Sequence, residues 1–376
     1  MRKKSQNLLV LLVISLVFCA LPGCVSRKGG LQKTVSPESV PQGLVSENLL
    51  KAGGLQILWQ NELPLEKSEK LKQLFILGNR IYALSGRNYL AALDGDKGIF
   101  IFGRKIAPNG FPVIGPELYK NGLLAIIGDR LVELHPEFGT ELSVSDLEIS
   151  VTCPVVRNNT YFYVAGVDKR LHALLADGKV KIFEVAADND SRIISIVADD
   201  DFVVFATDAG NVISMAPDGP RRLWQFDASD SIVGAIVRDA NSLFFACKDT
   251  NVYRIDIRTG RLQWKYQTAA ILEKSPRVTE GVVYQYVRNK GLAAIDKEKG
   301  KLIWQLPEGV DLLAEANGKA YVITNVGTLA VMDNRKAKQL YSVNFAQVSK
   351  YVTNTVDSKI YIADQAGRIA CLKPTD

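Results

Sequence analysis

The sequence predicts an all-β protein, an eight-bladed β-propeller, and three observations lead to that prediction. Segment 282–304 consists of three short runs rich in β-branched and aromatic residues, separated by polar turns that contain Gly, as expected of short antiparallel strands. Nearly the same pattern recurs every 37 to 41 residues, close to the length of a four-stranded propeller blade. Hydrophobic residues make up 47% of the chain, enough for a large core, and the repeat region shows no extended helical periodicity.

The repeat is counted from an anchor position at the turn after the third strand of each unit. Asp296 is the anchor of the clearest unit, and eight units follow from it. A single four-stranded sheet cannot bury both of its faces, so the units are expected to pack against one another in a closed ring. The anchors are Asp94, His135, Leu175, Ala216, Asp256, Asp296, Asp333 and Leu372.

A second signature, Asp-x3-Gly-x3-aromatic, begins at several of these anchors. Gly suits a turn position with positive φ, and the Asp side chain accepts hydrogen bonds from turn amides. The aromatic residue on the outer strand offers a large apolar surface to the neighbouring blade. Only the second unit, around Ser143, lacks an obvious aromatic residue. The expected blade-docking aromatics are Trp59, Phe102, Phe183, Trp224, Trp264, Trp304 and Tyr341.

The last unit lacks its fourth strand, because the chain ends at Asp376, soon after Leu372. Segment 54–63, near the other end of the chain, has the character of an outer strand and contains Trp59. Pairing this N-terminal strand with the last blade closes the ring and leaves few free sheet edges. The propeller is therefore expected to span residues 54–376, with its last blade built from both ends of the chain.

Residues 1–23 read as a signal peptide. Basic residues at 2–4 precede an apolar run at 8–20 that is too short for a comfortable membrane span. Leu21-Pro22-Gly23-Cys24 resembles the bacterial lipobox, and this resemblance implies that Cys24 is acylated and becomes the mature N-terminus. The alternative is an ordinary secretory signal with a chance Cys. In lipoproteins with such a lipobox, an Asp after the Cys commonly signals retention in the inner membrane. Val25 stands at that position here, so the resemblance implies the periplasmic side of the outer membrane if the host is Gram-negative.

Residues 24–53 contain several Gly and Pro residues and many polar ones, so a flexible tether is expected between the lipidated Cys24 and the propeller. Removal of the signal peptide lowers the formal net charge from +6 to +3. This mild charge, without a basic stripe, does not favour nucleic-acid binding.

Few residues suggest catalysis or metal binding. His135 and His172, the only two histidines, fall at a turn and in a strand, so we expect structural roles for both. Cys153, Cys247 and Cys371 fall in units that are not neighbours in a ring and are expected to be buried thiols. Acidic runs at 94–96, 188–190 and 199–201 could supply oxygens to Ca²⁺, but they read more simply as solvated turns. We expect neither a metal nor a cofactor.

The units resemble the quinoprotein-type (PQQ-like) propeller repeat, most clearly at 256–264, DIRTGRLQW, and at 292–304. The resemblance extends over 55–373 and is specific for the fold but weak for function. One branch of this repeat family, the quinoprotein dehydrogenases, holds PQQ and Ca²⁺ and commonly has two adjacent cysteines beside the quinone. The present sequence has no adjacent cysteines, so we do not expect an enzyme.

The other branch, the BamB family of outer-membrane assembly lipoproteins, is similar in its lipobox, tether, blade count and split closing blade. This resemblance implies a non-catalytic scaffold that binds the β-barrel insertase BamA. The family's partner contacts include an Arg before the fourth blade, matched by Arg192, and a D-x-D pair before the fifth blade. Asp230 matches the first acid of that pair, whereas Ile232 stands at the second. Ile193 and Ile232 are candidate apolar anchors of such an interface.

The function expected from the sequence is a lipid-anchored periplasmic scaffold for outer-membrane β-barrel assembly. A ligand-binding or sensor propeller of the cell envelope is the alternative, because closed propellers present a central funnel that accepts many ligands. A quinoprotein dehydrogenase is a third and less favoured interpretation of the sequence.

Overall fold

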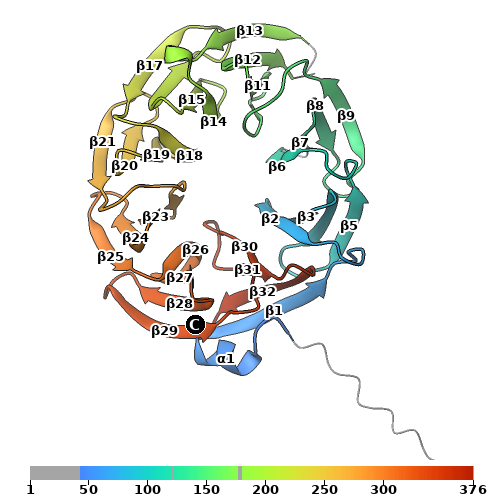
Figure 1. The fold of residues 1–376 in the computed structure, drawn as a ribbon, viewed down its shortest axis with the longest axis vertical. Helices are drawn as coiled ribbons and strands as arrows, with labels where there is room; N and C mark the ends of the chain where they lie inside the picture. The colour runs from blue at the N-terminus through green and yellow to red at the C-terminus, as the bar shows by residue number, and fades with distance from the viewer. Residues whose placement is uncertain (1–42, 121, 177–179, 376) are drawn as a thin grey trace, which may run out of the picture. The chain divides into compact units, whose positions relative to one another are not determined.

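The computed structural model describes residues 43–120, 122–176 and 180–375. Within these ranges the chain forms eight four-stranded antiparallel sheets arranged as the blades of a ring (Figure 1). The prediction of an all-β, eight-bladed propeller is therefore confirmed. In each blade the first strand lies nearest the centre and the fourth lies at the rim.

The first four blades follow one another in chain order. Blade 1 consists of β2 (Leu71–Leu77), β3 (Arg80–Ser85), β4 (Tyr89–Asp94) and β5 (Phe100–Lys105). Blade 2 consists of β6 (Val113–Tyr119), β7 (Gly122–Ile127), β8 (Arg130–Leu134) and β9 (Glu141–Asp146). Blade 3 consists of β10 (Val156–Arg157), β11 (Tyr161–Ala165), β12 (Arg170–Leu175) and β13 (Lys181–Ala186). Blade 4 follows a short 3₁₀ turn (Asp188–Asp190) and consists of β14 (Ile193–Ala198), β15 (Val203–Thr207), β16 (Asn211–Met215) and β17 (Arg222–Asp227).

The remaining blades keep this order until the last. Blade 5 consists of β18 (Ile232–Asp239), β19 (Ser242–Cys247), β20 (Asn251–Asp256) and β21 (Leu262–Gln267). Blade 6 consists of β22 (Arg277–Val278), β23 (Val282–Val287), β24 (Gly291–Asp296) and β25 (Leu302–Leu306). Blade 7 consists of β26 (Gly309–Ala316), β27 (Lys319–Thr324), β28 (Thr328–Asp333) and β29 (Lys338–Asn344). Blade 8 consists of β30 (Lys350–Val352), β31 (Ile360–Ala363), β32 (Arg368–Pro374) and, as its rim strand, β1 (Leu55–Glu62).

The ring is closed by the N-terminal strand, as predicted. β1 pairs antiparallel with β32, from Leu55 opposite Pro374 to Glu62 opposite Arg368. Figure 1 shows the blue β1 lying along the red β32. Blade 8 therefore joins two segments that lie more than 300 residues apart in sequence.

The core lies between neighbouring blades. The second and third strands are apolar and buried on both faces, as in β7, whose six residues are all buried. Each face packs against a different blade, so these strands read as continuous apolar runs rather than as alternating ones. Separate clusters of buried side chains fill the spaces between adjacent blades, for example the cluster that joins blades 1 and 2 through Tyr82, Phe102 and Leu123.

The rim aromatic of one blade packs on the turn of the next blade. The indole nitrogen of Trp59 donates a hydrogen bond to the carbonyl oxygen of Gly95, at 3.0 Å, and the indole ring lies against Gly98. A Cβ atom on Gly98 would lie 2.4 Å from the Trp59 ring, so only Gly allows this approach. Trp224 and Trp264 repeat both contacts, because they donate to the carbonyl oxygens of Ile257 and Lys297 and lie against Gly260 and Gly300.

The other rim aromatics make only part of this contact or none of it. Phe102 is buried against Gly139, Phe183 is half-buried, and Trp304 donates to Asn334 Oδ1 at 2.7 Å. Tyr341 departs from the pattern, because it is 46% exposed. Blade 8, the next blade in the ring, takes its third and fourth strands from opposite ends of the chain, so no turn joins them and none is present to receive Tyr341.

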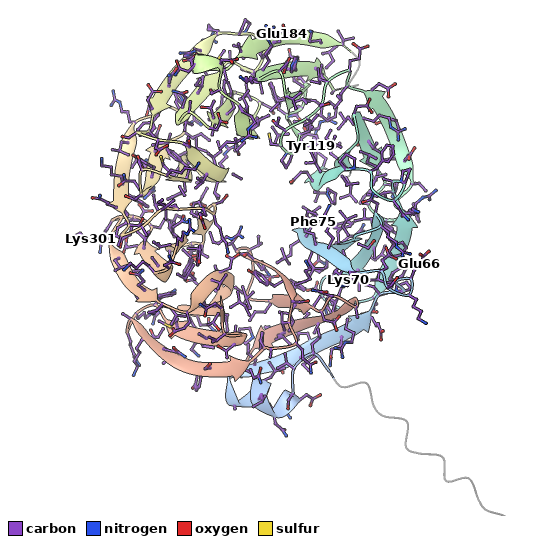
Figure 2. The ribbon with its side chains drawn as sticks, in the orientation of Figure 1. Glu66, Lys70, Phe75, Tyr119, Glu184 and Lys301 are labelled. Carbon is purple, nitrogen blue, oxygen red and sulfur yellow. The ribbon has the colours of Figure 1, made fainter. Side chains whose placement is uncertain are left out.

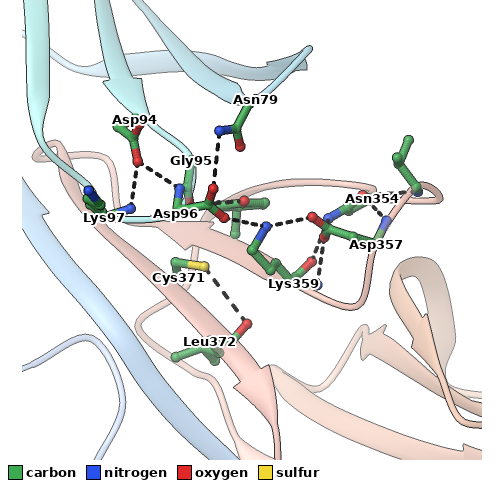
Figure 3. Close-up of polar contacts among 12 residues, drawn as sticks. Asn79, Asp94, Gly95, Asp96, Lys97, Asn354, Asp357, Lys359, Cys371 and Leu372 are labelled. Atoms are coloured by element: carbon green, nitrogen blue, oxygen red, sulfur yellow. Dashed lines mark hydrogen bonds and ion pairs between the residues drawn. The ribbon is translucent and has the colours of Figure 1, made fainter.

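The anchor Asp residues cap the turns on which the aromatics lie. Asp94 Oδ1 accepts hydrogen bonds from the backbone amides of Asp96 and Lys97, at 3.0 and 2.7 Å (Figure 3). The anchors Asp256, Asp296 and Asp333 accept the two corresponding amides in their own turns. Both acids of the run at 94–96 therefore have partners. Asp94 caps the turn, and Asp96 forms the ion pair described next.

Blade 8 is held to blade 1 by polar contacts at the same turn. Lys359 Nζ lies 2.8 Å from Asp96 Oδ1 in blade 1 and 2.6 Å from Asp357 Oδ2 in blade 8 (Figure 3). The Tyr361 hydroxyl donates to the same Gly95 carbonyl oxygen as Trp59, at 3.2 Å. β1 and β31 of blade 8, which come from opposite ends of the chain, therefore contact one carbonyl of blade 1.

The expectation of a flexible tether over 24–53 does not hold for residues 43–53. A short helix, α1 (Glu47–Ala52), contacts β1 and β29, and Leu44, Val45 and Leu50 are buried in the cluster between blades 7 and 8. Residues 43–53 therefore pack against the propeller. Cys24 and the predicted signal peptide lie outside the described residues.

Truncation of Trp59 should destabilise the ring far more than truncation of Tyr341. Trp59→Ala removes a buried indole and its hydrogen bond, so the free energy of unfolding should fall by about 3–5 kcal/mol. Tyr341→Ala removes an exposed ring and should change it by less than about 1 kcal/mol. Chemical denaturation of both variants beside the wild type measures the difference. Equal losses would contradict the assignment of Trp59 as the docking residue and Tyr341 as an exposed one.

The Lys359 ion pairs should make the closure of the ring sensitive to acid. The hydrogen bond from Lys359 lowers the pKa of Asp96. Burial opposes ionisation of Asp357, but hydrogen bonds from Lys359 outweigh it and lower the pKa of that carboxyl as well. Carboxylates with a lowered pKa in the folded state stabilise it above their unfolded pKa of about 3.9, and this stabilisation is lost as pH falls through the folded pKa.

The melting temperature of Lys359→Met should therefore lie below that of the wild type at pH 7, and the gap should narrow below about pH 4. Thermal unfolding at several pH values measures the gap. Lys301→Met, a change at an exposed turn residue, is the control and should show no such gap at any pH. A Lys359→Met gap that stays the same from pH 7 to pH 3 would show that these ion pairs do not stabilise the closure.

Candidate protein-interaction site

Arg192 and Asp230 lie on neighbouring segments that lead from the rim of one blade to the inner strand of the next. Arg192 directly precedes β14 of blade 4, and Asp230 is separated from β18 of blade 5 by one residue, Ser231. In an antiparallel blade, the turn between the second and third strands lies at the same end as the start of the first strand. The two residues therefore share one face of the ring with the turns at 208–210 and 248–250.

Arg192 is held by the turn of its own blade. Its backbone amide donates to Asp208 Oδ1 at 2.8 Å, and its Nε lies 3.5 Å from Asp208 Oδ2. The Asp208 amide donates in return to the Arg192 carbonyl oxygen, at 3.0 Å. The side chain is 60% exposed, so the guanidinium remains accessible while its base is fixed.

Asp230 is exposed, and its backbone is fixed by blades 4 and 5 together. Cys247 Sγ in blade 5 donates to the Asp230 carbonyl oxygen at 3.0 Å. Gly210 in blade 4 approaches the same oxygen so closely that a Cβ atom would lie 2.5 Å from it, and the φ of Gly210 is +92°. The 208–210 turn thus links the two candidate residues, since it bonds Arg192 at one end and packs on Asp230 at the other.

The apolar neighbours do not form an exposed anchor. Ile193 and Ile232 are both buried, in the clusters between blades 3 and 4 and between blades 4 and 5. The expectation that they provide apolar contact area is therefore wrong. As the first residues of inner strands, they turn their side chains between blades, and the surface at this position is polar.

Two further acids belong to this surface and were not singled out from the sequence. Asp208 holds Arg192, and Asp249 accepts hydrogen bonds from the Tyr253 hydroxyl, at 2.5 Å, and from the Asn251 amide, at 3.0 Å. Burial opposes ionisation of Asp249, but these hydrogen bonds outweigh it and lower the pKa of the carboxyl. The signal in the sequence is an Asp within three residues after the second strand, which recurs at Asp168 and Asp364 in blades 3 and 8.

The central part of the ring holds a separate cavity of about 310 Å³, lined by strands of blades 1, 2, 6 and 8. Arg277 forms a two-pronged ion pair with Asp311, at 3.0 and 2.9 Å. Burial raises the pKa of Glu117, and burial together with the Asp311 charge raises the pKa of Tyr351 to about 12. Figure 2 shows Phe75, which also lines this cavity, at the inner margin of the ring.

The histidines have local partners. His135 Nδ1 accepts the Glu137 amide at 3.1 Å, so this imidazole caps its turn at the position where other blades have an Asp. His172 is buried in blade 3, with Nε2 3.0 Å from Asp168 Oδ2 and Nδ1 3.6 Å from Glu184 Oε2.

The three propeller cysteines are unpaired and buried, and burial raises the pKa of each thiol to about 12. No cluster of three or more potential metal ligands occurs among the described residues. In the same residues, no helix has the length and apolar character of a membrane span.

Comparisons with known proteins agree with this architecture. The sequence family described as "Outer membrane protein assembly factor BamB" matches residues 128–271 and 248–376. No curated protein matches the chain.

Two solved structures share the fold. BamB from Moraxella catarrhalis superposes with a TM-score of 0.65 and 13% identity, over 85% of this chain and 99% of that one. The computationally designed Ika8 protein gives 0.64 and 13%, over 82% and 98%. The family match extends over more than half of the sequence, and the closed eight-bladed ring is consistent with it, so the chain belongs to the family of the outer membrane protein assembly factor BamB.

Proposed function

We propose that this protein is a non-catalytic, lipid-anchored scaffold in the periplasm that takes part in outer-membrane β-barrel assembly by binding BamA. The observation that carries the proposal is the family match over 128–376, which names an outer-membrane assembly factor. A scaffold needs a rigid body that presents fixed side chains. The docked blades and the Lys359 contacts across the closing blade provide such rigidity.

The proposed contact surface is the linked set Arg192, Asp208 and Asp230. An interface needs charged groups whose geometry is set before binding, since ordering them on binding costs free energy. Arg192 meets this requirement through its two contacts with Asp208, and Asp230 through the backbone contacts with Cys247 and Gly210. Their exposed charged groups can form charge-assisted hydrogen bonds with a partner of mixed charge.

The proposed anchor is Cys24, in the lipobox-like sequence Leu21-Pro22-Gly23-Cys24. In this proposal residues 1–23 are removed, several acyl chains on Cys24 hold the protein at the outer membrane, and the segment up to residue 42 acts as the tether. Mass spectrometry of the mature N-terminus tests the acylation, and Cys24→Ser should release the protein from the membrane fraction.

The central cavity supports a second candidate, a propeller that binds a small ligand in the cell envelope. Its lining combines an aromatic ring, a guanidinium and a carboxyl with a raised pKa in about 310 Å³. Pockets that bind small molecules have this mixture of apolar walls and a few polar groups. A thermal-shift screen would favour this candidate if a ligand raised the melting temperature of the wild type but not that of Arg277→Ala.

Charge reversal at the proposed surface should weaken binding to the purified periplasmic domains of BamA. Arg192→Glu and Asp230→Lys should each raise the Kd by about tenfold or more, because each reversal replaces an attraction across the interface with a repulsion. Biolayer interferometry with immobilised protein measures the Kd.

Arg258→Glu is the matched control, because Arg258 is exposed in a turn at the opposite face of blade 5. It should leave the Kd unchanged. No detectable binding of the wild type, even after crosslinking, would refute the BamA assignment. Binding that both reversals leave unchanged would refute only the proposed surface.

A further inference from the structure

The rim strand of blade 2, β9, differs from the other seven rim strands in what it contributes to the core. Each of the others places at least one side chain in a hydrophobic cluster between blades, such as Trp59 from β1 or Val343 from β29. No residue of β9 belongs to any of these clusters, including the one between blades 2 and 3. Ser143 stands where other blades have their docking aromatic, and its hydroxyl donates to Glu133 Oε2 at 3.3 Å. β9 is thus attached mainly through its ladder with β8.

The apolar side chains of β9 face solvent instead. Leu142 is 53% exposed and Val144 is 38% exposed, and Phe138, in the turn just before the strand, is 62% exposed. Four consecutive residues of this six-residue strand are exposed. The strand offers about 20 Å of extended backbone whose outer edge pairs with no other strand of the ring.

β9 also lacks the usual protection of a free edge. Lys and Arg on an edge strand discourage pairing with other chains, because a new strand would have to bury or approach their charge. β25 has Lys301 immediately before it, and β1 is contacted by α1. The other protected rim strands contain a cation within their bounds, namely β5, β13, β17, β21 and β29. β9 has neither kind of protection.

The charges of β9 select the partner. Glu141 and Asp146, at its two ends, are both acidic, and Glu148 lies just beyond. Arg130 is the neighbouring cation, opposite Asp146 on the inner side of the pair. Antiparallel pairing of β9 with a second copy of itself would place Glu141 near Asp146 of the other copy, and like charges directly opposite each other destabilise a strand pair. A partner strand with basic residues at both ends would be attracted to Glu141 at one end of β9 and to Asp146 at the other.

We propose that β9 is a site of strand addition for an extended segment of another protein that carries Lys or Arg at both ends and small or β-branched residues between them. The added strand pairs with the free backbone edge of β9. Its side chains cover Leu142 and Val144, and its basic ends contact Glu141 and Asp146. This site is separate from the Arg192 surface and does not depend on the identity of the partner there.

The test uses three labelled peptides and fluorescence anisotropy. The first is Lys-Lys-Val-Thr-Val-Thr-Lys-Lys, and the second has Glu in place of every Lys. The third is the basic peptide with N-methyl groups on all four residues between its Lys pairs, so that neither backbone edge can pair with a strand. The full-length protein should bind the first peptide and not the second. Its affinity for the third peptide should be lower than for the first by about tenfold or more.

Two variants and a matched control locate the site. Val144→Lys and Leu142→Lys each add a cation to the exposed strand and should weaken binding of the basic peptide by about tenfold. Leu262→Lys on β21 is the control, because Leu262 is 46% exposed on a rim strand that already has Lys265, and it should leave binding unchanged. Circular dichroism checks that each variant is folded.

Several results would overturn the proposal. One is equal binding of the methylated and unmethylated basic peptides, since this would show charge attraction without strand pairing. A second is absence of binding by the basic peptide, and a third is a Leu262→Lys effect as large as that of Val144→Lys. Light scattering that finds a dimer abolished by Val144→Lys would show that the edge pairs with a second copy of the chain and not with a basic strand.

Discussion

The contact between a rim aromatic and the turn of the next blade is the interaction on which this ring depends. It combines apolar burial, a side-chain hydrogen bond and a Gly with positive φ, so each blade fixes the position of its neighbour. Because a single blade cannot bury its own faces, each blade depends on packing against its neighbours around the circle. The docking contact is missing after Ser143 in blade 2 and after Tyr341 in blade 7, and Phe183 of blade 3 is only half-buried. α1 packs beside the second of these places, where it contacts β29 and β1.

The closing blade shows how the ring meets the same requirement with two chain ends. Trp59 and Tyr361, from strands at opposite ends of the sequence, donate to one carbonyl oxygen, that of Gly95. Lys359 adds an ion pair to the neighbouring Asp96. Blade 1 therefore orients both parts of blade 8, and the pairing of β1 with β32 depends on a third element as well as on its own ladder.

Much of this architecture could be predicted because it is encoded as a period. The anchors at intervals of 37 to 41 residues gave the number of blades, and the absent fourth strand after Leu372 gave the closure. Features that depend on contacts between blades, and not on the repeat itself, could not be predicted. Tyr341 has the right spacing but no turn to lie on, and that depends on how blade 8 is assembled. Ile193 and Ile232 are buried by neighbouring blades, and the link from Arg192 to Asp230 runs through Gly210, whose role depends on a contact between two blades.

The two ends of the propeller are neighbours as well as partners. The amide of Thr375 donates to the carbonyl oxygen of Gly54 at 2.8 Å, so a short peptide would span the distance between them. Once they are joined, the backbone would form an uninterrupted loop through all eight sheets, and new termini could be opened in a turn elsewhere on the circle. Circular permutation of this kind treats every blade as a possible first blade, since the order in which the sheets are synthesised is not what holds them in place.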